Sequence, residues 1–213
     1  MKNDAHHEIS PGIAICISGP SGVGKGTVIR ELMTINADFW LSVSMTTREP
    51  RPGEVDGVSY LFTTPEKFRD LQSAGGFLET DEYCGNFYGT PLAPVQQHLE
   101  MGHHVIFDVT VPGTFAIKES LPSAVSVFLL PPDLQSLIQR LRHRGTETEE
   151  KLIKRFRKAK EEIRSAKAFD YVVINDDEKK AAERIFSIVE SSRFLAERQE
   201  KQIEKLLRED ISI

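Results

Sequence analysis

Short runs of apolar, mostly β-branched residues alternate along the chain with segments whose apolar positions recur at helical spacing. The apolar runs, which we predict to be strands, cover residues 13–18, 105–109, 125–130 and 171–174. Each run is almost continuously apolar, as expected of strands that are covered on both faces. The segments between them, which we predict to be helices, cover residues 27–33, 92–101, 134–143, 152–167 and 179–208. This alternation predicts an α/β fold in which helices wrap a parallel sheet.

Two stretches interrupt the alternation of this 213-residue chain, which we interpret as a single domain. Residues 46–91 are rich in Pro, Gly, Thr and aromatic residues, and they predict a small, mostly β insertion. Residues 139–167 are densely charged; Gly145 ends one helix there, and Thr146 with Glu149 forms a capping box for the next. Such an arginine-rich helical excursion beside a phosphate site is typical of a lid. The predicted core comprises the remaining segments, 1–45, 92–138 and 168–213.

The last predicted helix begins amphipathic, with apolar positions at Ile185, Ile188 and Val189, but its apolar stripe thins after Ala196. We interpret this segment as a docked helix whose end protrudes. The protruding end is a candidate contact for a second copy of the chain.

A glycine-rich segment joins the first predicted strand to the first predicted helix. It consists of Gly19, Pro20, Ser21, Gly22, Val23, Gly24, Lys25, Gly26 and Thr27. Its glycines let the backbone curl into a nest of N–H groups, and the helix that follows adds the positive end of its dipole. In this strand–loop–helix context, the G-x-x-x-x-G-K spacing predicts that the segment binds a nucleoside triphosphate, with Lys25 reaching the outer phosphates. The alternative is a glycine-rich turn with a solvated lysine.

Two features of the sequence concern Mg²⁺. Gly26 follows Lys25 where Ser or Thr is usual, and Thr27 comes one position later, so the hydroxyl that would hold Mg²⁺ is missing or displaced. A predicted strand ends in Asp108, and an acid there faces Mg²⁺ in phosphate-loop proteins, directly or through water. The alternative for Asp108 is a turn signal. Paired histidines at 6–7 and 103–104 lack the spacing of a metal site, because neighbours on a strand point to opposite faces.

A stiff loop displays two arginines. Pro50 and Pro52 exclude a helix, so Arg48 and Arg51 extend from the loop without helical neighbours to pair with. Two guanidinium groups in this arrangement suit a phosphate, which accepts bidentate hydrogen bonds. A solvated basic turn is the alternative.

The composition restricts the partners and the compartment. A net charge of −5 and a pI of about 5.7 argue against a protein that coats a nucleic acid polymer or an anionic membrane. The two cysteines, Cys16 and Cys84, do not form a disulfide framework. We find neither a signal-peptide core nor an apolar segment long enough to cross a bilayer, and we expect a cytoplasmic protein.

The chain resembles the guanylate kinases, a family of phosphate-loop nucleoside monophosphate kinases, from about residue 12 to 190. The family signature is matched at Thr46, Thr47, Arg48, Arg51, Glu54, Gly57, Tyr60 and Phe62, and again at 77–79, 85–90, Arg140, 144–150, Arg155 and 173–177. The resemblance implies a phosphate-loop α/β sandwich with a GMP-binding insertion at 46–91 and a helical lid at 139–167. It also implies an enzyme of purine nucleotide metabolism that uses Mg²⁺ and transfers the γ-phosphate of ATP to GMP or dGMP.

The resemblance further implies roles for individual residues. Those expected to hold the phosphate of GMP are Ser44, Arg48, Arg51, Tyr60 and Tyr88, with Glu54 steadying their loop. Glu79 and Thr90 would read guanine, whose N1–H and amine are donors and whose O6 is an acceptor. The expected catalytic residues are Lys25 and the lid arginines Arg140, Arg144 and Arg155, while Asn175 would lie near the adenine of ATP. Arg144, just before Gly145, is also favoured there by the helix dipole without any ligand.

The chain departs from the family pattern after Asp108. Where the family has acid-x-Asp-x-Gln-Gly, Thr110 and Pro112 replace a carboxylate and an amide near the substrate. Thr110 can form hydrogen bonds, but it cannot balance the charge of a nearby arginine. Two other functions remain open: a guanylate-kinase-like protein-binding module, which typically lacks a working glycine loop and the arginine set, and a kinase for another small phosphate ester.

Overall fold

The computed structural model describes residues 11–143 and 149–209. At its centre lies a sheet of five strands in the order β2-β7-β1-β8-β9, all of them parallel. The strands are β1 (Ala14–Ser18), β2 (Phe39–Leu41), β7 (His104–Asp108), β8 (Val125–Leu130) and β9 (Tyr171–Ile174). The predicted α/β class and the parallel sheet are therefore confirmed. The short strand β2 was not predicted, because its three residues give no periodicity to detect.

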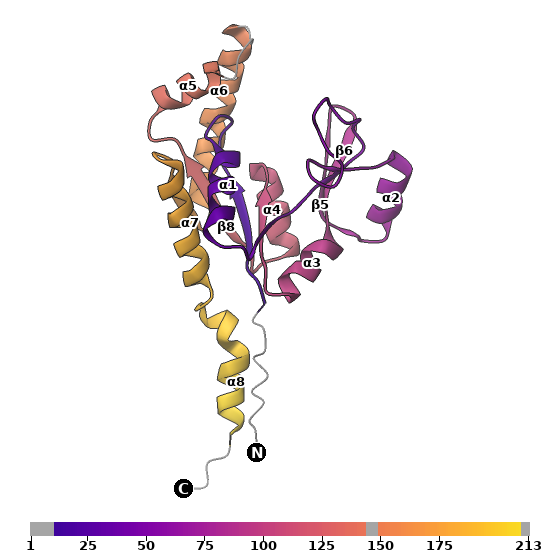
Figure 1. Cartoon of the computed structure of the whole chain (residues 1–213), viewed down its shortest axis with the longest axis vertical. Coiled ribbons are helices and arrows are strands. Elements are labelled where there is room, and N and C mark those ends of the chain that lie inside the picture. The colour runs from indigo at the N-terminus through magenta and orange to yellow at the C-terminus, as the bar shows by residue number, and fades with distance from the viewer. Residues whose placement is uncertain (1–10, 144–148, 210–213) are drawn as a thin grey trace.

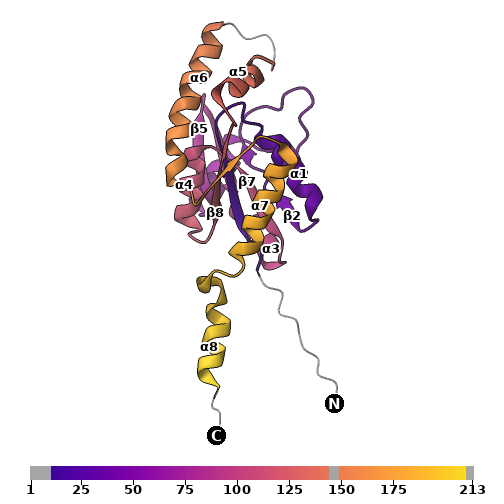
Figure 2. The ribbon, with the colours of Figure 1, turned by 90° about the vertical axis from the view of Figure 1, so that its left-hand side faces the viewer.

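Helices cover both faces of this sheet. On one face, Ile15 and Ile17 of β1 are fully buried against α1 (Lys25–Ile35) and α7 (Glu178–Ser192). On the other face, Cys16 is buried against α3 (Leu92–Glu100) and α4 (Val111–Ser120). Side chains alternate between the two faces of a strand, so a strand buried on both sides must be apolar throughout. Figure 2 shows α4 and α7 on opposite sides of the sheet.

A second sheet stands beside the first (Figure 1). Its strands, in the order β4-β3-β6-β5, are β3 (Met45–Thr46), β4 (Leu61–Phe62), β5 (Phe77–Tyr83) and β6 (Asn86–Pro91). The insertion also contains helix α2 (Pro65–Ser73), which was not predicted. Thr64 caps α2 by accepting from the backbone N–H of Lys67, and the buried Phe68 stacks on Phe77. Phe68 gives α2 an apolar contact that holds it against the second sheet.

Helices α5 (Leu134–His143) and α6 (Glu149–Arg164) extend above the central sheet, and a 3₁₀ turn at Ser165–Ala168 follows α6 (Figures 1 and 2). Gly145 and Thr146, assigned above to a helix end and a capping box, lie outside the described residues. Among the described residues, no helix combines the length and the apolar character needed to cross a lipid bilayer.

The single helix predicted over 179–208 was wrong, because the chain forms two helices there. Helix α7 ends at Ser192, a 3₁₀ turn follows at Ala196–Gln199, and α8 covers Glu200–Arg208. The backbone of Leu195 is not helical, with a ψ of 136°. The side chain of Gln199 donates to the carbonyl of Arg193 at 2.8 Å, which satisfies an acceptor that a continuous helix would have used. Helix α8 projects from the body of the protein (Figure 1).

Helix α4 was also missed, because Pro112 and Gly113 read as loop residues. Proline is tolerated in the first turn of a helix, where its missing N–H costs nothing. The hydroxyl of Thr110 caps this helix by accepting from the N–H of Gly113 at 3.2 Å. The departure from the family pattern at positions 110 and 112 therefore supplies a helix start.

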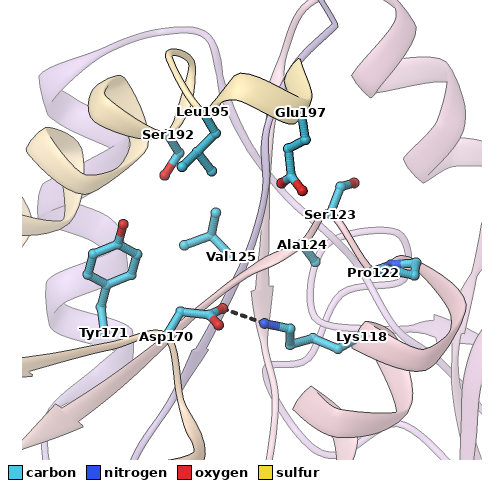
Figure 3. A pocket seen from close by; sticks show the side chains of 10 residues that line it. All are labelled: Lys118, Pro122, Ser123, Ala124, Val125, Asp170, Tyr171, Ser192, Leu195 and Glu197. Atoms are coloured by element: carbon cyan, nitrogen blue, oxygen red, sulfur yellow. Dashed lines mark hydrogen bonds and ion pairs between the residues drawn. The ribbon is translucent and has the colours of Figure 1, made fainter. Parts of the chain in front are cut away.

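Asp170 ties three elements together at the edge of a cavity of about 390 Å³ (Figure 3). Its carboxylate accepts from the N–H and the hydroxyl of Ser126, at 2.8 and 2.7 Å, and from Lys118 of α4. Burial alone would raise the pKa of Asp170, but the hydrogen bonds from Lys118 and Ser126 lower this pKa below its ordinary value.

We expect Asp170→Asn to lower the melting temperature by about 2–4 °C at pH 7. The carboxylate is 40% exposed, so its loss should cost only about 1 kcal/mol. The pKa of Asp170 is lower in the folded than in the unfolded state. Its contribution to the free energy of unfolding is therefore fully present above the unfolded pKa and is lost as the pH falls through the folded pKa. When thermal unfolding of the wild type and of Asp170→Asn is measured from pH 7 towards pH 3, the difference between their melting temperatures should become smaller. A difference that stays constant with pH, or an equal loss in the exposed control Asp70→Asn, would contradict this assignment.

Candidate active site

The glycine-rich segment leaves the end of β1 and forms a tight loop before α1. Gly22 and Gly24 have positive φ values of 88° and 96°, which glycine adopts without strain. A Cβ atom at Gly24 would also lie 2.9 Å from Nδ2 of Asn175. Gly24 is the N-cap of α1, and no side chain caps this helix end. The first N–H groups of α1 therefore face the loop with no side-chain acceptor, an arrangement suited to an anion.

Lys25 is the first residue of α1, and its ammonium group contacts both the start of this loop and a neighbouring strand. Its Nζ atom donates to the carbonyl of Gly19 at 3.4 Å and lies 3.9 Å from Oδ1 of Asp108, at the end of the neighbouring strand β7. Burial raises the pKa of the Asp108 carboxyl, and the positive charge of Lys25 opposes that rise. Parallel pairing of β1 with β7 thus brings together the two residues that the sequence suggested separately.

Arg140 and Asn175 hold the other side of the loop. Both donate to the carbonyl of Val23, Arg140 at 2.8 Å and Asn175 at 2.7 Å. Asn175 is 2% exposed, and its Oδ1 atom has no hydrogen-bond partner in the described part of the chain. A buried carbonyl oxygen without a donor is costly, so this atom suits a ligand that can donate to it.

Helix α6 reaches the loop at Ser21. Nη2 of Arg155 donates to the hydroxyl of Ser21 at 2.9 Å, and the carboxylate of Glu162 accepts from the Ser21 N–H at 3.3 Å. Arg144, the other lid arginine expected at this site, lies outside the described residues.

Thr27 is less clearly part of the site. Its hydroxyl accepts from Nη2 of Arg30 at 3.4 Å, one turn further along α1, and Gly26 is exposed with open space around its α-carbon. The structure brings Lys25 to Asp108, but it gives no contact between Thr27 and Asp108.

A cavity of about 850 Å³ lies between the second sheet, the start of α4 and helix α6. Seven of the eight residues assigned to GMP line it: Ser44, Arg48, Arg51, Glu54, Tyr60, Glu79 and Tyr88. Asp108 lines it as well, so the cavity reaches the residue beside Lys25. Thr110 and Pro112, the two departures from the family pattern, form part of the opposite wall.

The arginine loop is held in place by Glu54. Nη2 of Arg48 donates to both carboxylate oxygens of Glu54, at 2.8 and 3.0 Å, and the N–H of Arg51 donates to the same carboxylate at 2.8 Å. The guanidinium of Arg48 also lies 5.4 Å from the ring centre of Tyr60. The hydrogen bond from Arg48 holds the pKa of Glu54 below its usual value. Glu54 thus fixes the loop that carries both arginines.

Thr90 does not line the cavity itself, but it contacts a residue that does. Glu79 and Thr90 are cross-strand partners on β5 and β6, and the Thr90 hydroxyl donates to Oε1 of Glu79 at 2.7 Å. Burial raises the pKa of Glu79, and the hydrogen bond from Thr90 opposes the rise. The result is an oriented carboxylate in the cavity wall, able to accept from a ligand with two neighbouring donors.

Sequence reasoning missed the contribution of α6 to this cavity. The lining residues of this helix and the turn after it are Lys158, Glu161, Glu162 and Ser165. Arg155, Lys158, Glu162 and Ser165 follow one another at intervals of three and four residues, which places them on one helix face. This spacing was the signal that could have identified the helix face. It was overlooked because the whole segment is densely charged.

Comparisons with known proteins point to one family. The family model described as guanylate kinase matches residues 12–192. A guanylate kinase of Streptococcus mutans is 45% identical over 203 residues, which cover 95% of this chain and 97% of that relative. A guanylate kinase of Streptococcus pyogenes is 47% identical over 198 residues, with coverage of 92% and 94%. The crystal structure of guanylate kinase from Anaplasma phagocytophilum is similar with a TM-score of 0.69 and 30% identity, covering 91% of this chain and 96% of that one.

Proposed function

Because the chain belongs to the guanylate kinase family, we infer that it transfers the γ-phosphate of ATP to GMP, giving ADP and GDP, and we propose how its residues do so. The proposal rests on one observation: Glu79, Arg48 and Asp108 line the same cavity, and Asp108 lies beside Lys25. A nucleoside monophosphate bound along this cavity would present its phosphate near the glycine-rich loop. A protein-binding module would not require that loop and arginine set together.

Glu79 and Thr90 recognise the base of the acceptor. The carboxylate of Glu79, which the hydrogen bond from Thr90 orients before the base binds, accepts from guanine N1–H and from the exocyclic amine. Rotation of the Thr90 hydroxyl about its Cβ–Oγ bond lets it donate to O6 of guanine. The pair therefore accepts GMP or dGMP and disfavours adenine, which presents an acceptor at N1.

The phosphate of GMP is bound by the loop that Glu54 fixes. Arg48 and Arg51 supply two guanidinium groups, and the remaining donors are the hydroxyls of Ser44, Tyr60 and Tyr88, all on the cavity wall. Because Glu54 already orders this loop, less conformational entropy is lost when the phosphate binds.

ATP binds on the opposite side, with its β-phosphate in the nest of Gly19–Thr27 and its adenine amine near the unpaired Oδ1 of Asn175. Lys25, Arg140, Arg144 and Arg155 stabilise the charge that spreads over the transferred phosphoryl group. The phosphate of GMP is already an anionic nucleophile, so positioning and charge neutralisation replace a general base.

The donor set fits Mg²⁺ delivered with ATP. The described residues contain no cluster of three or more His, Cys, Asp or Glu that could hold a metal by themselves. Mg²⁺ bound to a nucleotide usually takes one or two carboxylates and keeps several waters. Asp108 would therefore hold it, directly or through water, with the hydroxyl of Thr27 as a further oxygen donor. The ion would neutralise charge on the β- and γ-phosphates.

A coupled assay of ADP release across GMP, dGMP, AMP, CMP and UMP tests the proposal. We expect rapid ADP release with GMP and with dGMP, and little with the other three acceptors. Comparable rates with GMP and with AMP would refute the guanylate assignment and leave a kinase for another phosphate ester.

The arginines of the insertion and of the lid predict a closing motion. Arg48 and Arg51 line the substrate cavity from the second sheet, whereas Arg155 contacts Ser21 of the glycine-rich loop, so without ligand their like charges favour an open state in which the second sheet stays away from that loop. Bound phosphates remove this repulsion and should favour a closed state. We expect small-angle scattering to show a smaller radius of gyration with GMP plus a non-hydrolysable ATP analogue than with either alone. An unchanged radius would contradict the prediction.

The proposal also covers the setting of the enzyme. We place it in the cytoplasm, acting on free ATP and GMP rather than on a nucleic acid polymer or a membrane surface. Support comes from the net charge of −5, which disfavours anionic surfaces, and from Cys16 and Cys84, which are both free thiols.

Helix α8 is proposed as the contact of a homo-oligomer. Its apolar residues Ile203, Leu206 and Leu207 are 46%, 57% and 81% exposed, and the helix projects from the body in both views (Figures 1 and 2). Acidic and basic residues are equally frequent over 197–209, which suits pairing with a second copy of the same helix.

We expect Leu206→Asp to shift the protein to a monomer in analytical ultracentrifugation without lowering its melting temperature. The polar-face control Lys201→Ala should leave the oligomer unchanged. A wild-type protein that sediments as a monomer at every concentration would refute the proposal.

A further inference from the structure

Glu162 contacts the phosphate loop from outside it. This residue lies near the end of α6, and its Oε2 atom accepts from the backbone N–H of Ser21 at 3.3 Å. Its Oε1 atom lies 4.0 Å from Nζ of Lys158, one turn earlier on the same helix. The side chain of Glu162 is 21% exposed, so most of its surface is covered. A carboxylate from α6 therefore occupies a backbone donor of the glycine-rich loop, beside the nest proposed for the nucleotide phosphates.

Arg155 meets the same residue of the loop with the opposite charge. Its Nη2 atom donates to the Ser21 hydroxyl at 2.9 Å, two turns before Glu162 on α6. Helix α6 thus bonds to Ser21 twice, once through a cation and once through an anion. The arrival of a triphosphate affects the two contacts differently: the guanidinium is attracted to the phosphates, whereas the carboxylate meets like charge.

The loop provides a physical reason for an internal anion. Successive N–H groups of a nest point into one concavity and, together with the helix dipole of α1, create a positive potential there. An unfilled nest would leave its donors to water alone. A carboxylate oxygen has the charge and the acceptor geometry of a phosphate oxygen, so Glu162 can satisfy part of this site without nucleotide.

We propose that Glu162 serves as a stand-in for a phosphate oxygen in the enzyme without ATP, and that ATP must displace it to bind. Glu162 is then a positioning residue that lowers the affinity for ATP and holds α6 against the loop until the nucleotide arrives. On displacement, the carboxylate keeps its ion pair with Lys158, and the guanidinium of Arg155 can turn to the phosphates. The inference rests on the proposed use of this loop by ATP.

The competing interpretation is that Glu162 only anchors α6. An anchor contributes to the packing of the lid, so removing it would weaken ATP binding or leave it unchanged. Displacement predicts the opposite sign, because removing the competitor and its negative charge must strengthen binding. The direction of the change in ATP affinity therefore distinguishes the two interpretations.

Calorimetric titration with a non-hydrolysable ATP analogue and Mg²⁺, without GMP, provides the test. We expect Glu162→Gln, which preserves the shape and removes the charge, to lower the Kd of the analogue about 5- to 10-fold. This increase in affinity should become smaller at high salt, because screening weakens the repulsion that Glu162→Gln removes. Glu162→Ala, which removes the acceptor entirely, should bind the analogue at least as tightly as the wild type does.

The control Glu150→Gln makes the same charge change in the first turn of α6, where Glu150 is exposed, and it should leave the Kd of the analogue within about 2-fold of wild type. Thermal unfolding of each variant shows whether the fold is retained. Equal or weaker binding in both folded Glu162 variants would overturn the inference. Absence of analogue binding in the wild type would instead refute the proposed function.

Discussion

Lys25→Met should reduce kcat by at least about 10²–10³-fold while leaving the fold intact. The methionine keeps the length and the apolar stem of the side chain but removes the ammonium group. Among the described residues, the polar contacts of that group are with the Gly19 carbonyl, at 3.4 Å, and the Asp108 carboxylate, at 3.9 Å. Neither contact belongs to the hydrophobic core, so the variant should keep its folding stability. What it should lose is the stabilisation of the phosphoryl group during transfer.

Steady-state kinetics and thermal unfolding together check this result. The KM for GMP should change by no more than a few-fold, because Lys25 acts on the transferred group and not on the acceptor. The control Lys67→Met, at an exposed position in α2, should behave like the wild type. A Lys25 variant that keeps a near-normal kcat would mean that the glycine-rich loop is not the catalytic site.

The second large effect concerns the choice between guanine and adenine in the acceptor nucleotide. A site built on buried hydrogen bonds rejects an analogue that lacks them by roughly 10⁴-fold, so the wild type should prefer GMP over AMP by about this factor in kcat/KM. Glu79→Ala should remove much of that preference, because the carboxylate that accepts from guanine is gone. Thr90→Val removes one neutral hydrogen bond, which contributes about 0.5–1.5 kcal/mol, and should weaken GMP only about 2- to 12-fold.

The matched control for Glu79 is Glu82→Ala, on the same strand but outside the cavity wall. It should leave the preference for GMP unchanged. Burial raises the pKa of Glu79, so its ionised form is lost at a higher pH than for an ordinary glutamate. The KM for GMP should therefore rise in the wild type as the pH is lowered through that pKa. A preference that survives Glu79→Ala would show that another group selects the base.

The parts of the fold that the sequence predicted are those with a strong local signal. The strand before the phosphate loop is apolar throughout because both faces are buried, and Gly24 is required because its φ is positive and Asn175 lies against it. Helix α4 was missed because its cap, Thr110, and its first-turn proline give the composition of a loop. The end of α7 was missed because side-chain hydrogen bonds such as that of Gln199 to Arg193 decide where the helix stops.

The candidate site likewise contains residues that the sequence predicted and residues that it could not predict. Residues of the arginine loop were found because a family motif fixes their spacing, and the structure gathers them around one cavity through the register of a second sheet. Glu162 could not be found, because its contact with Ser21 joins positions 141 residues apart and depends on how α6 lies over the loop. Arg144, which the family motif also includes, lies outside the described residues.

The central claim is that the γ-phosphate of ATP passes directly to GMP in the cavity between the glycine-rich loop and the second sheet. Transfer of label from ATP carrying radioactive γ-phosphate tests it most directly, with products separated by chromatography. With GMP as acceptor we predict labelled GDP and an equal amount of unlabelled ADP, and with AMP almost no labelled nucleoside diphosphate. Label that appears as inorganic phosphate, or equally in ADP when AMP is the acceptor, would contradict the account.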